Sequence, residues 1–235
     1  MKIGYVPINS KSSLAFAPPR LLRGSRTQAL SDRAVQACPA VNVVERRIIE
    51  ILAPFSIQIR CISNSRSGYD FHIIENGTRI DREIIPQFVT FMPRKFWRNE
   101  KYPVVQIGLP HIFVCDENCY VTQMPAWASD RAANIPGQLI SGRFPTHIWP
   151  RSLNLSFEWK DFQADFKMKA GEPICYLFVE TDNLEANVSL VSAKMTADLR
   201  SYLDKMEDVV KFTSGSFGLF DRAAEVRPKT LLSEW

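Results

Sequence analysis

The sequence lacks the motifs that mark the commonest enzyme classes. Its 235 residues contain no P-loop, no Gly-x-Gly-x-x-Gly turn, no Gly-x-Ser-x-Gly elbow and no His-Glu-x-x-His helix. These motifs carry phosphate binding, dinucleotide binding, an activated serine and a zinc centre, respectively. Their absence argues against phosphoryl transfer, dinucleotide-dependent redox chemistry and serine hydrolysis.

Long apolar runs and an export signal are also missing. No stretch approaches the roughly 18 consecutive apolar residues that a membrane span requires. The segment 1–7 has no charged region followed by an apolar run, as a signal peptide would. The five cysteines are an odd number and are widely spread, which indicates reduced thiols buried as small apolar side chains. These features predict a cytoplasmic protein that contacts no membrane.

Glycine is scarce relative to proline, whereas aromatic residues are plentiful. The chain has ten Gly against fifteen Pro, with fifteen Phe, six Tyr and five Trp, which favours many short elements. Short β-branched or aromatic runs recur, with turn residues about every 8–12 residues. They cover residues 47–52, 55–62, 69–74, 87–92, 104–108, 111–115, 120–124, 153–159, 165–169 and 174–180. We therefore predict a mainly β fold, either a β-sandwich or a distorted jelly-roll barrel.

Two turn sequences predict hairpins within this fold. Asn76-Gly77 supplies the two positive φ positions of a type I′ turn between β-rich flanks. The polar run Asp116-Glu117-Asn118 separates the strands expected at 111–115 and 120–124, which predicts a second hairpin.

A helical period follows the last expected strand and predicts a C-terminal amphipathic helix. The apolar stripe consists of Val188, Val191, Met195, Leu199, Tyr202, Met206 and Val209. Asp182 or Asn183 is the expected N-cap. Asp204, Glu207 and Asp208 load the far end with negative charge, which opposes the helix macrodipole and indicates a docking place for a basic partner or for the chain's own basic arm. The expected organisation is a basic N-terminal arm (1–36), the β domain (37–181), the helix packed on it (182–212) and a surface tail (213–235).

Basic residues concentrate in the N-terminal arm, where six Lys or Arg accompany Asp32 alone. A second basic and aromatic cluster covers residues 92–98. Together they could bind nucleic acid through phosphate contacts and stacking. We favour the alternative for the second cluster, a solvated loop whose Phe96 and Trp97 pack inward.

Only three histidines occur, and each lies in or beside an expected strand. If His72, His111 and His147 converged in a barrel, they could hold a divalent metal. No His-x-His or His-x-Asp pair supports such a site, so ordinary structural histidines are favoured. Cys115 and Cys119 flank a turn, but no second pair completes four zinc ligands, and we expect two reduced cross-strand neighbours.

The segment 141–151 is dense in groups that bind anions and aromatic ligands. Arg143, His147, Trp149 and Arg151 are its candidate ligand-binding residues. Arginine recognises carboxylate or phosphate with two parallel hydrogen bonds, and tryptophan offers a stacking face. Strand alternation would send His147, Trp149 and Arg151 to one face. The alternative is structural, with Glu158 or Asp165 pairing Arg151.

Three short stretches, Ala37-Cys38-Pro39-Ala40, Ala53-Pro54-Phe55 and 144–149, resemble an uncharacterised family of bacterial and phage proteins. The resemblance covers roughly residues 37–180 and implies a viral or mobile-element context, without any catalytic residue. Two functions remain open. One is a binding protein or enzyme that recognises a small anionic or peptide-like ligand, and the other is a non-catalytic interaction or assembly protein.

Overall fold

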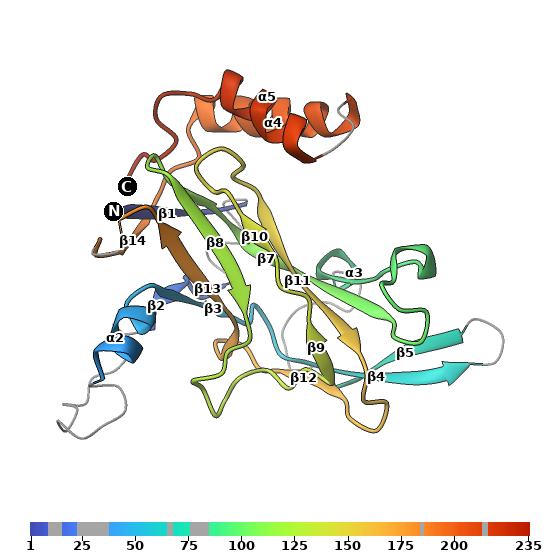
Figure 1. Cartoon of the computed structure of the whole chain (residues 1–235). Coiled ribbons are helices and arrows are strands. Elements are labelled where there is room, and N and C mark those ends of the chain that lie inside the picture. Colours follow the sequence, from blue (N-terminus) through green and yellow to red (C-terminus); the bar gives the residue numbers. More distant parts are fainter. Residues whose placement is uncertain (9–15, 23–37, 65–67, 76–84, 184–185, 213–215) are drawn as a thin grey trace.

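Three β-sheets pack around a common apolar core in the computed structural model (Figure 1), which describes residues 1–8, 16–22, 38–64, 68–75, 85–183, 186–212 and 216–235. The first sheet has six strands. In spatial order they are β14 (Ser189–Ser192), β1 (Lys2–Pro7), β7 (Val104–Val114), β11 (Ser152–Trp159) and β9 (Gly137–Leu139), with β6 (Val89–Phe91) also paired to β7. Only the β1–β14 pair of this sheet is parallel.

The second sheet has five strands and the third has three. The five are β10 (Arg143–Phe144), β8 (Cys119–Met124), β13 (Pro173–Thr181), β3 (Ile48–Leu52) and β2 (Arg20–Leu21). The three are β12 (Phe166–Met168), β4 (Ile57–Asn64) and β5 (Gly68–Glu75). The connections that the structure describes contain three short helical segments: α2 (Pro39–Glu45), α3 (Ile85–Phe88) and the 3-10 helix η3 (Arg94–Phe96).

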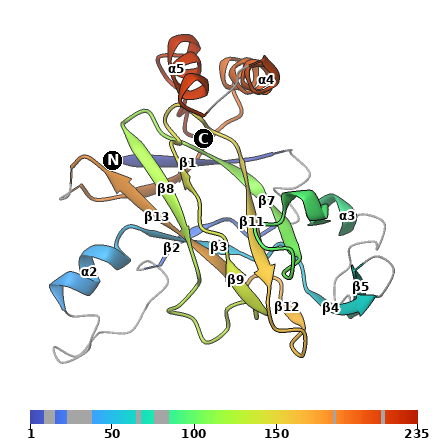
Figure 2. The same ribbon diagram turned by 45° about the vertical axis from the view of Figure 1, so that its right-hand side comes forward.

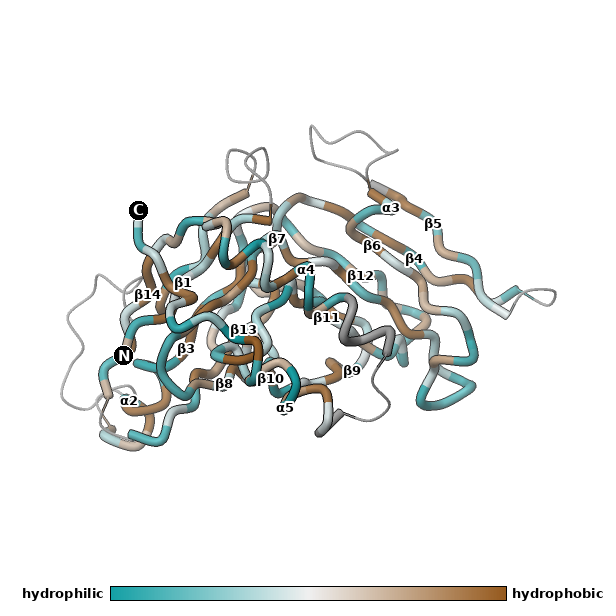
Figure 3. The backbone as a smooth tube through the Cα atoms, turned by 90° about the horizontal axis from the view of Figure 1, so that it is seen from above, coloured by the Kyte–Doolittle hydropathy of each residue, from teal (hydrophilic) through white to brown (hydrophobic). Residues whose placement is uncertain are grey.

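The inner faces of the sheets supply the main core. Ile107 and Phe157 of the first sheet, Leu177 of the second, and Ile59 and Phe166 of the third are all fully buried in it. Seen from above, apolar segments line the interior strands of all three sheets (Figure 3). Because successive strand residues point to opposite faces, these positions alternate with residues on the outer faces.

The central strand β7 bends near its middle. Pro110 has no N–H to donate, and the register with β11 shifts between Ser152 and Asn154 at the same level. The Ser152 hydroxyl donates to the carbonyl of Leu109 at 3.1 Å. This irregularity separates the β7 half that pairs with β6 from the half that pairs with β1.

Two C-terminal helices cover the outer face of the first sheet at the β1–β7 end. They are α4 (Ala197–Phe212) and α5 (Ser216–Val226), which lie side by side above that sheet (Figure 2). Their buried residues form a second apolar cluster with the outward side chains of β1 and β7. Its members are Val6, Ile112, Val114, Trp149, Ala193, Leu199, Tyr202, Met206, Ala223 and Leu231.

The predicted fold class is confirmed as a mainly β, sandwich-like arrangement with a C-terminal amphipathic helix. The expected strands are present, although 104–108 and 111–115 form one strand, β7. None of the described sheets closes into a barrel. In the part of the chain that the structure describes, no helix combines the length and apolarity needed to cross a membrane.

The predicted limits of the C-terminal helix are wrong. The helix begins at Ala197, and the Thr196 hydroxyl caps it by accepting from the N–H of Leu199 at 3.1 Å, in place of Asp182 or Asn183. Residues 189–192 form β14, because the edge of β1 offers a parallel backbone partner there. The expected surface tail contains α5, and Leu231 beyond it is buried.

The N-terminal arm and the two hairpins also differ from expectation. Residues 2–7 of the arm form β1 inside the first sheet, and residues 20–21 form β2. The predicted turn at Asn76-Gly77 lies outside the described residues. The prediction of a second hairpin is wrong, since β7 and β8 belong to different sheets and residues 115–118 form the corner between them.

Leu199→Ala should lower the free energy of unfolding by about 2–4 kcal/mol, because the Leu199 side chain is only 1% exposed beneath α4 and its loss leaves a cavity. Chemical denaturation measures the change. Lys205→Ala, on the exposed side of the same helix, serves as the control. An unchanged stability in the Leu199 variant would contradict the packing of α4 on the sheet.

Candidate functional site

The loop between β10 and β11 carries most of the predicted ligand-binding residues, and it is a turn. The N–H groups of Ile148 and Trp149 both donate to the carbonyl of Pro145, at 3.1 and 2.7 Å. Strand alternation therefore does not apply, and the prediction that His147, Trp149 and Arg151 share one face is wrong. The turn sends His147 toward β8 and Trp149 toward the C-terminal helices.

Trp149 and Arg151 line a cavity of about 450 Å³ against α4. We call this cavity the α4 pocket. It is lined by Ile8, Ile112, Trp149, Pro150, Arg151, Ser152, Met195, Arg200, Leu203, Asp204, Met206 and Glu207. Its walls come from β7, the start of β11, the segment before α4 and α4 itself, so the pocket forms only when the helix docks.

The floor of the α4 pocket is apolar and rigidly packed. Ile112, Trp149 and Met206 are buried, and Met195 and Leu203 are half-buried against the same cluster. The indole of Trp149 meets the ring of Phe220 edge-on, with 5.8 Å between centroids. Such a floor can hold an apolar or aromatic body of a ligand by removing its surface from water.

The rim of the α4 pocket carries four charged side chains: Arg151, Arg200, Asp204 and Glu207, all exposed. Within the described residues, none of the four forms an ion pair. The Arg151 side chain donates from Nε to the carbonyl of Ser152, at 3.3 Å. Both guanidinium groups therefore keep donors that can bind a carboxylate or phosphate.

Glu158 and Asp165, the two acids expected to compete for Arg151, pair with other cations. Glu158 accepts from Arg98 at 2.9 Å, and Asp165 accepts from Arg60 at 2.8 Å. These hydrogen bonds hold the pKa of each carboxyl group below its usual range. The alternative in which Glu158 or Asp165 pairs with Arg151, and so gives it a structural role, is therefore wrong.

Arg143 and His147 do not reach the α4 pocket. The Arg143 guanidinium donates to Glu180 at 3.0 Å and stacks over the Tyr120 ring, 3.6 Å from its centroid. The Nδ1 atom of His147 lies 3.2 Å from the backbone nitrogen of Cys119, and burial lowers the pKa of the imidazole. Both residues connect strands and loops of the second sheet, so the four candidates do not form one site.

The three histidines do not converge on a metal. His72 is exposed on β5 of the third sheet, His111 is buried on β7 beside Tyr5, and His147 contacts the start of β8. Among the described residues no group of three or more His, Cys, Asp or Glu could hold a metal ion. The three-histidine site is wrong because β5, β7 and the turn before β11, which carry these residues, lie in different parts of the sandwich.

The basic and aromatic cluster at 92–98 is largely neutralised by its own neighbours. Arg94 pairs with Glu100 at 3.0 Å, and Arg98 pairs with Glu158. The expectation that Phe96 packs inward is wrong, since this side chain is 59% exposed. Trp97 is half-buried, and its indole N–H donates to the carbonyl of Met92 at 2.7 Å.

Another cavity, of about 430 Å³, lies beside β12 and has a different character. Its polar lining residues are engaged locally: Asn134 forms a bridge with Lys167, and the Ser56 hydroxyl accepts from the N–H of Ala170 at 3.0 Å. The α4 pocket combines a buried apolar floor with charged groups that form no ion pair in the part of the chain that the structure describes, so it is the better candidate site.

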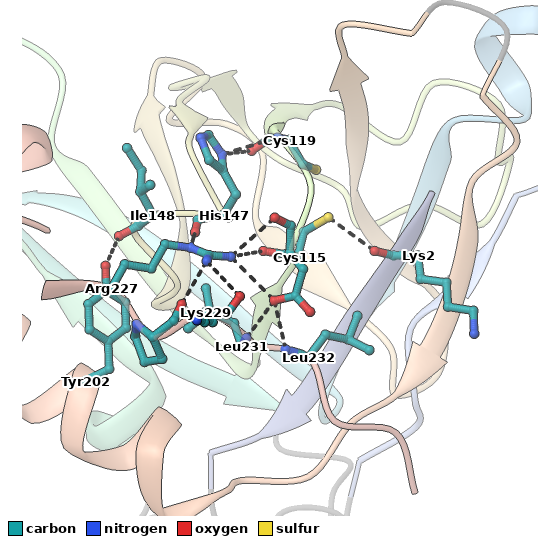
Figure 4. A network of polar contacts seen from close by, with 12 residues as sticks. Lys2, Cys115, Cys119, His147, Ile148, Tyr202, Arg227, Lys229, Leu231 and Leu232 are labelled. Atoms are coloured by element: carbon teal, nitrogen blue, oxygen red, sulfur yellow. Dashed lines mark hydrogen bonds and ion pairs between the residues drawn. The ribbon is translucent and has the colours of Figure 1, made fainter. Parts of the chain in front are cut away.

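Sequence reasoning missed the residue that holds the site together, Arg227 (Figure 4). Its guanidinium donates to the carbonyls of Cys115 and Asp116 at 3.3 Å, and to the carbonyl of His147. The Asp116 carboxylate in turn accepts from the N–H of Leu231 at 2.6 Å. We call these contacts the Arg227 clamp. No local motif marks these contacts, because Arg227 lies more than a hundred residues along the chain from Cys115 and Asp116.

Comparisons with known proteins found no match: no protein-family model, no curated protein and no solved structure matches the chain. The resemblance to an uncharacterised bacterial and phage family stays a prediction.

Acidification should destabilise the protein through His111. Burial lowers the pKa of this imidazole from 6.5 to about 4, so the unfolded chain takes up a proton before the folded chain does. The contribution of His111 to the free energy of unfolding should therefore fall as the pH drops from 6.5 to about 4. Denaturation curves across this window measure it, and His111→Gln should flatten the dependence. An equal slope in the variant would contradict the assignment.

Arg227→Ala should lower the free energy of unfolding by about 2–3 kcal/mol, because it leaves several carbonyls and the Asp116 carboxylate without their charged donor. Arg222→Ala is the matched control on α5, where an exposed arginine pairs with Glu225. Thermal denaturation of both variants gives the comparison. Equal melting temperatures would mean that the clamp adds no stability.

Proposed function

We propose that this protein binds a short peptide with apolar side chains, or a closely peptide-like small molecule, in the α4 pocket. One observation carries the proposal: an apolar cavity of about 450 Å³ has two arginines and two acids on its rim, and none of the four forms an ion pair with another described residue. Small-molecule sites usually have volumes of about 300–1,000 Å³, apolar walls and a few placed polar groups.

The spacing of the charges on α4 supports a ligand with opposite charges at its two ends. Arg200, Asp204 and Glu207 line the pocket at helical spacings of four and three residues. With a rise of 1.5 Å per residue, Arg200 and Glu207 are about 10 Å apart along the helix axis. An extended chain covers about 3.3–3.6 Å per residue, so two or three residues bridge that distance.

The order of these charges sets the direction of the ligand. Along the pocket side of α4, Arg200 stands at the end of the first turn, and Asp204 and Glu207 follow it in the middle of the helix. A bound peptide with its carboxylate at Arg200 and its ammonium group at Glu207 would place an opposite charge beside each end of this row.

Arg151 supplies the second half of the carboxylate site in this proposal. It enters the rim from the loop before β11, whereas Arg200 enters from α4. Two guanidinium groups from separate elements can hold one carboxylate by charge-assisted hydrogen bonds. The buried floor beneath them, with Trp149 and Met206, receives the apolar side chains.

Isothermal titration calorimetry with trileucine, and with its N-acetylated and C-amidated forms, tests the proposal. Trileucine should bind, and amidation should weaken binding by about tenfold or more, since one charge-assisted hydrogen bond contributes about 1.5–3 kcal/mol. Arg151→Ala and Arg200→Ala should weaken trileucine to a similar extent. Glu207→Gln should abolish the difference between the free and N-acetylated peptides.

Arg222→Ala, with an exposed arginine on α5 outside the pocket, should bind trileucine as the parent protein does. Melting temperatures of all variants separate lost binding from lost folding. The absence of heat with trileucine and with other apolar di- and tripeptides would contradict the proposal. Binding of inorganic phosphate alone would contradict it as well and would reduce the pocket to an anion site.

A further inference from the structure

Cys115 and Cys119 lie on the inner side of the corner that joins the two larger sheets. Cys115 directly follows β7, Cys119 begins β8, and only three exposed residues separate them. Both cysteines have 0% exposure and belong to the main apolar core. Because β7 and β8 run in different sheets, this pair sits where those sheets converge, apart from the α4 pocket.

The side chains of Cys115 and Cys119 lie beside one another (Figure 4) and have unequal surroundings. The interaction between the two thiols raises the pKa of Cys115 and lowers the pKa of Cys119. The S–H of Cys115 donates to the carbonyl of Lys2, with 3.2 Å between sulfur and oxygen, and the Thr146 hydroxyl donates to the Cys119 sulfur at 3.4 Å. Cys119 is therefore the thiol better prepared to act as a thiolate nucleophile, with a second thiol in contact with it.

The remaining buried thiols offer a contrast within the same chain. Burial raises the pKa of Cys175 to about 12, and Cys61 has a similar value. Burial is the main cause of the pKa shift of both thiols. The pair at the corner is thus chemically distinct from the cysteines that serve only as apolar core residues.

The Arg227 clamp covers the corner from outside (Figure 4). Arg227 bonds the carbonyl of Cys115 and both the carbonyl and carboxylate of Asp116 at 3.3–3.4 Å. The main chain at Leu231 bonds the same carboxylate. Because both cysteines are fully buried, a reagent can reach their sulfurs only through a local opening, and an opening at the corner would break the clamp.

We propose that Cys115 and Cys119 form a reversible disulfide when hydrogen peroxide or a small organic hydroperoxide reaches the corner. The Cys119 thiolate attacks a peroxide oxygen, the O–O bond breaks, and Cys119 becomes a sulfenic acid with release of water or an alcohol. The Cys115 sulfur then attacks the Cys119 sulfur and water leaves. Two electrons pass from the sulfurs to the peroxide, and the two thiol protons end in the released molecules.

Oxidation of the full chain followed by peptide mapping tests the proposal directly. The protein, carrying Cys38→Ser to remove an exposed thiol, is treated with hydrogen peroxide, then denatured and alkylated. Cys115 and Cys119 fall in one tryptic peptide, residues 102–131. That peptide should lose about 2 Da, carry no alkyl group, and regain two alkylation sites after reduction with dithiothreitol.

Single variants assign the roles of the two sulfurs. Cys115→Ser should leave a sulfenic acid at Cys119 that dimedone traps, whereas Cys119→Ser should give no adduct at Cys115. Cys175→Ser should still form the disulfide. Arg227→Ala should speed the oxidation by about tenfold or more, because the cover opens more often.

A peptide 102–131 that stays fully alkylated after peroxide treatment, or that only gains oxygen, would overturn the proposal. This measurement needs no substitution in the core, since the one residue changed, Cys38, is exposed. An unchanged oxidation rate in folded Arg227→Ala protein would overturn the role of the clamp.

Discussion

The candidate site depends on the contact between the Arg227 guanidinium and the backbone carbonyls of two separate turns. It binds the corner after β7 at Cys115 and Asp116, and the loop before β11 at His147. Turn carbonyls lack ladder partners, and an arginine, with five donors in a fixed fork, can serve several of them at once. The Tyr202 hydroxyl supports the same loop, 2.6 Å from the carbonyl of Ile148.

This arrangement explains why a pocket exists where it does. Because the 145–151 loop is held from both sides, its turn cannot relax into a strand, and Trp149 is directed under α4 while Arg151 emerges at the rim. The clamp bonds both the loop that lines the pocket and the corner that carries the two cysteines, so loosening of the clamp would affect both of them.

Much of the fold could be predicted from local sequence patterns, and the failures have a common cause. Alternation along 55–61 correctly placed Ile57, Ile59 and Cys61 in the core, and the helical stripe correctly placed Leu199. Val191 fits the same stripe but lies in β14, because β1 offers it a parallel partner, with Gly4 opposite Val191. A local period records which face is apolar, and it does not record which distant segment will pair with the backbone.

The candidate site was half predictable for the same reason. The composition of 141–151 indicated ligand chemistry, and Trp149 and Arg151 do line a pocket, whereas Glu180 and the start of β8 engage Arg143 and His147. The missing half lies on α4, where the sequence carried a usable signal. The acids at 204 and 207 could be recognised in the sequence as a docking place for a basic partner, but the sequence does not show which other side chains face them. Only the docked helix brings Arg200, Asp204 and Glu207 to one cavity with Trp149 and Arg151.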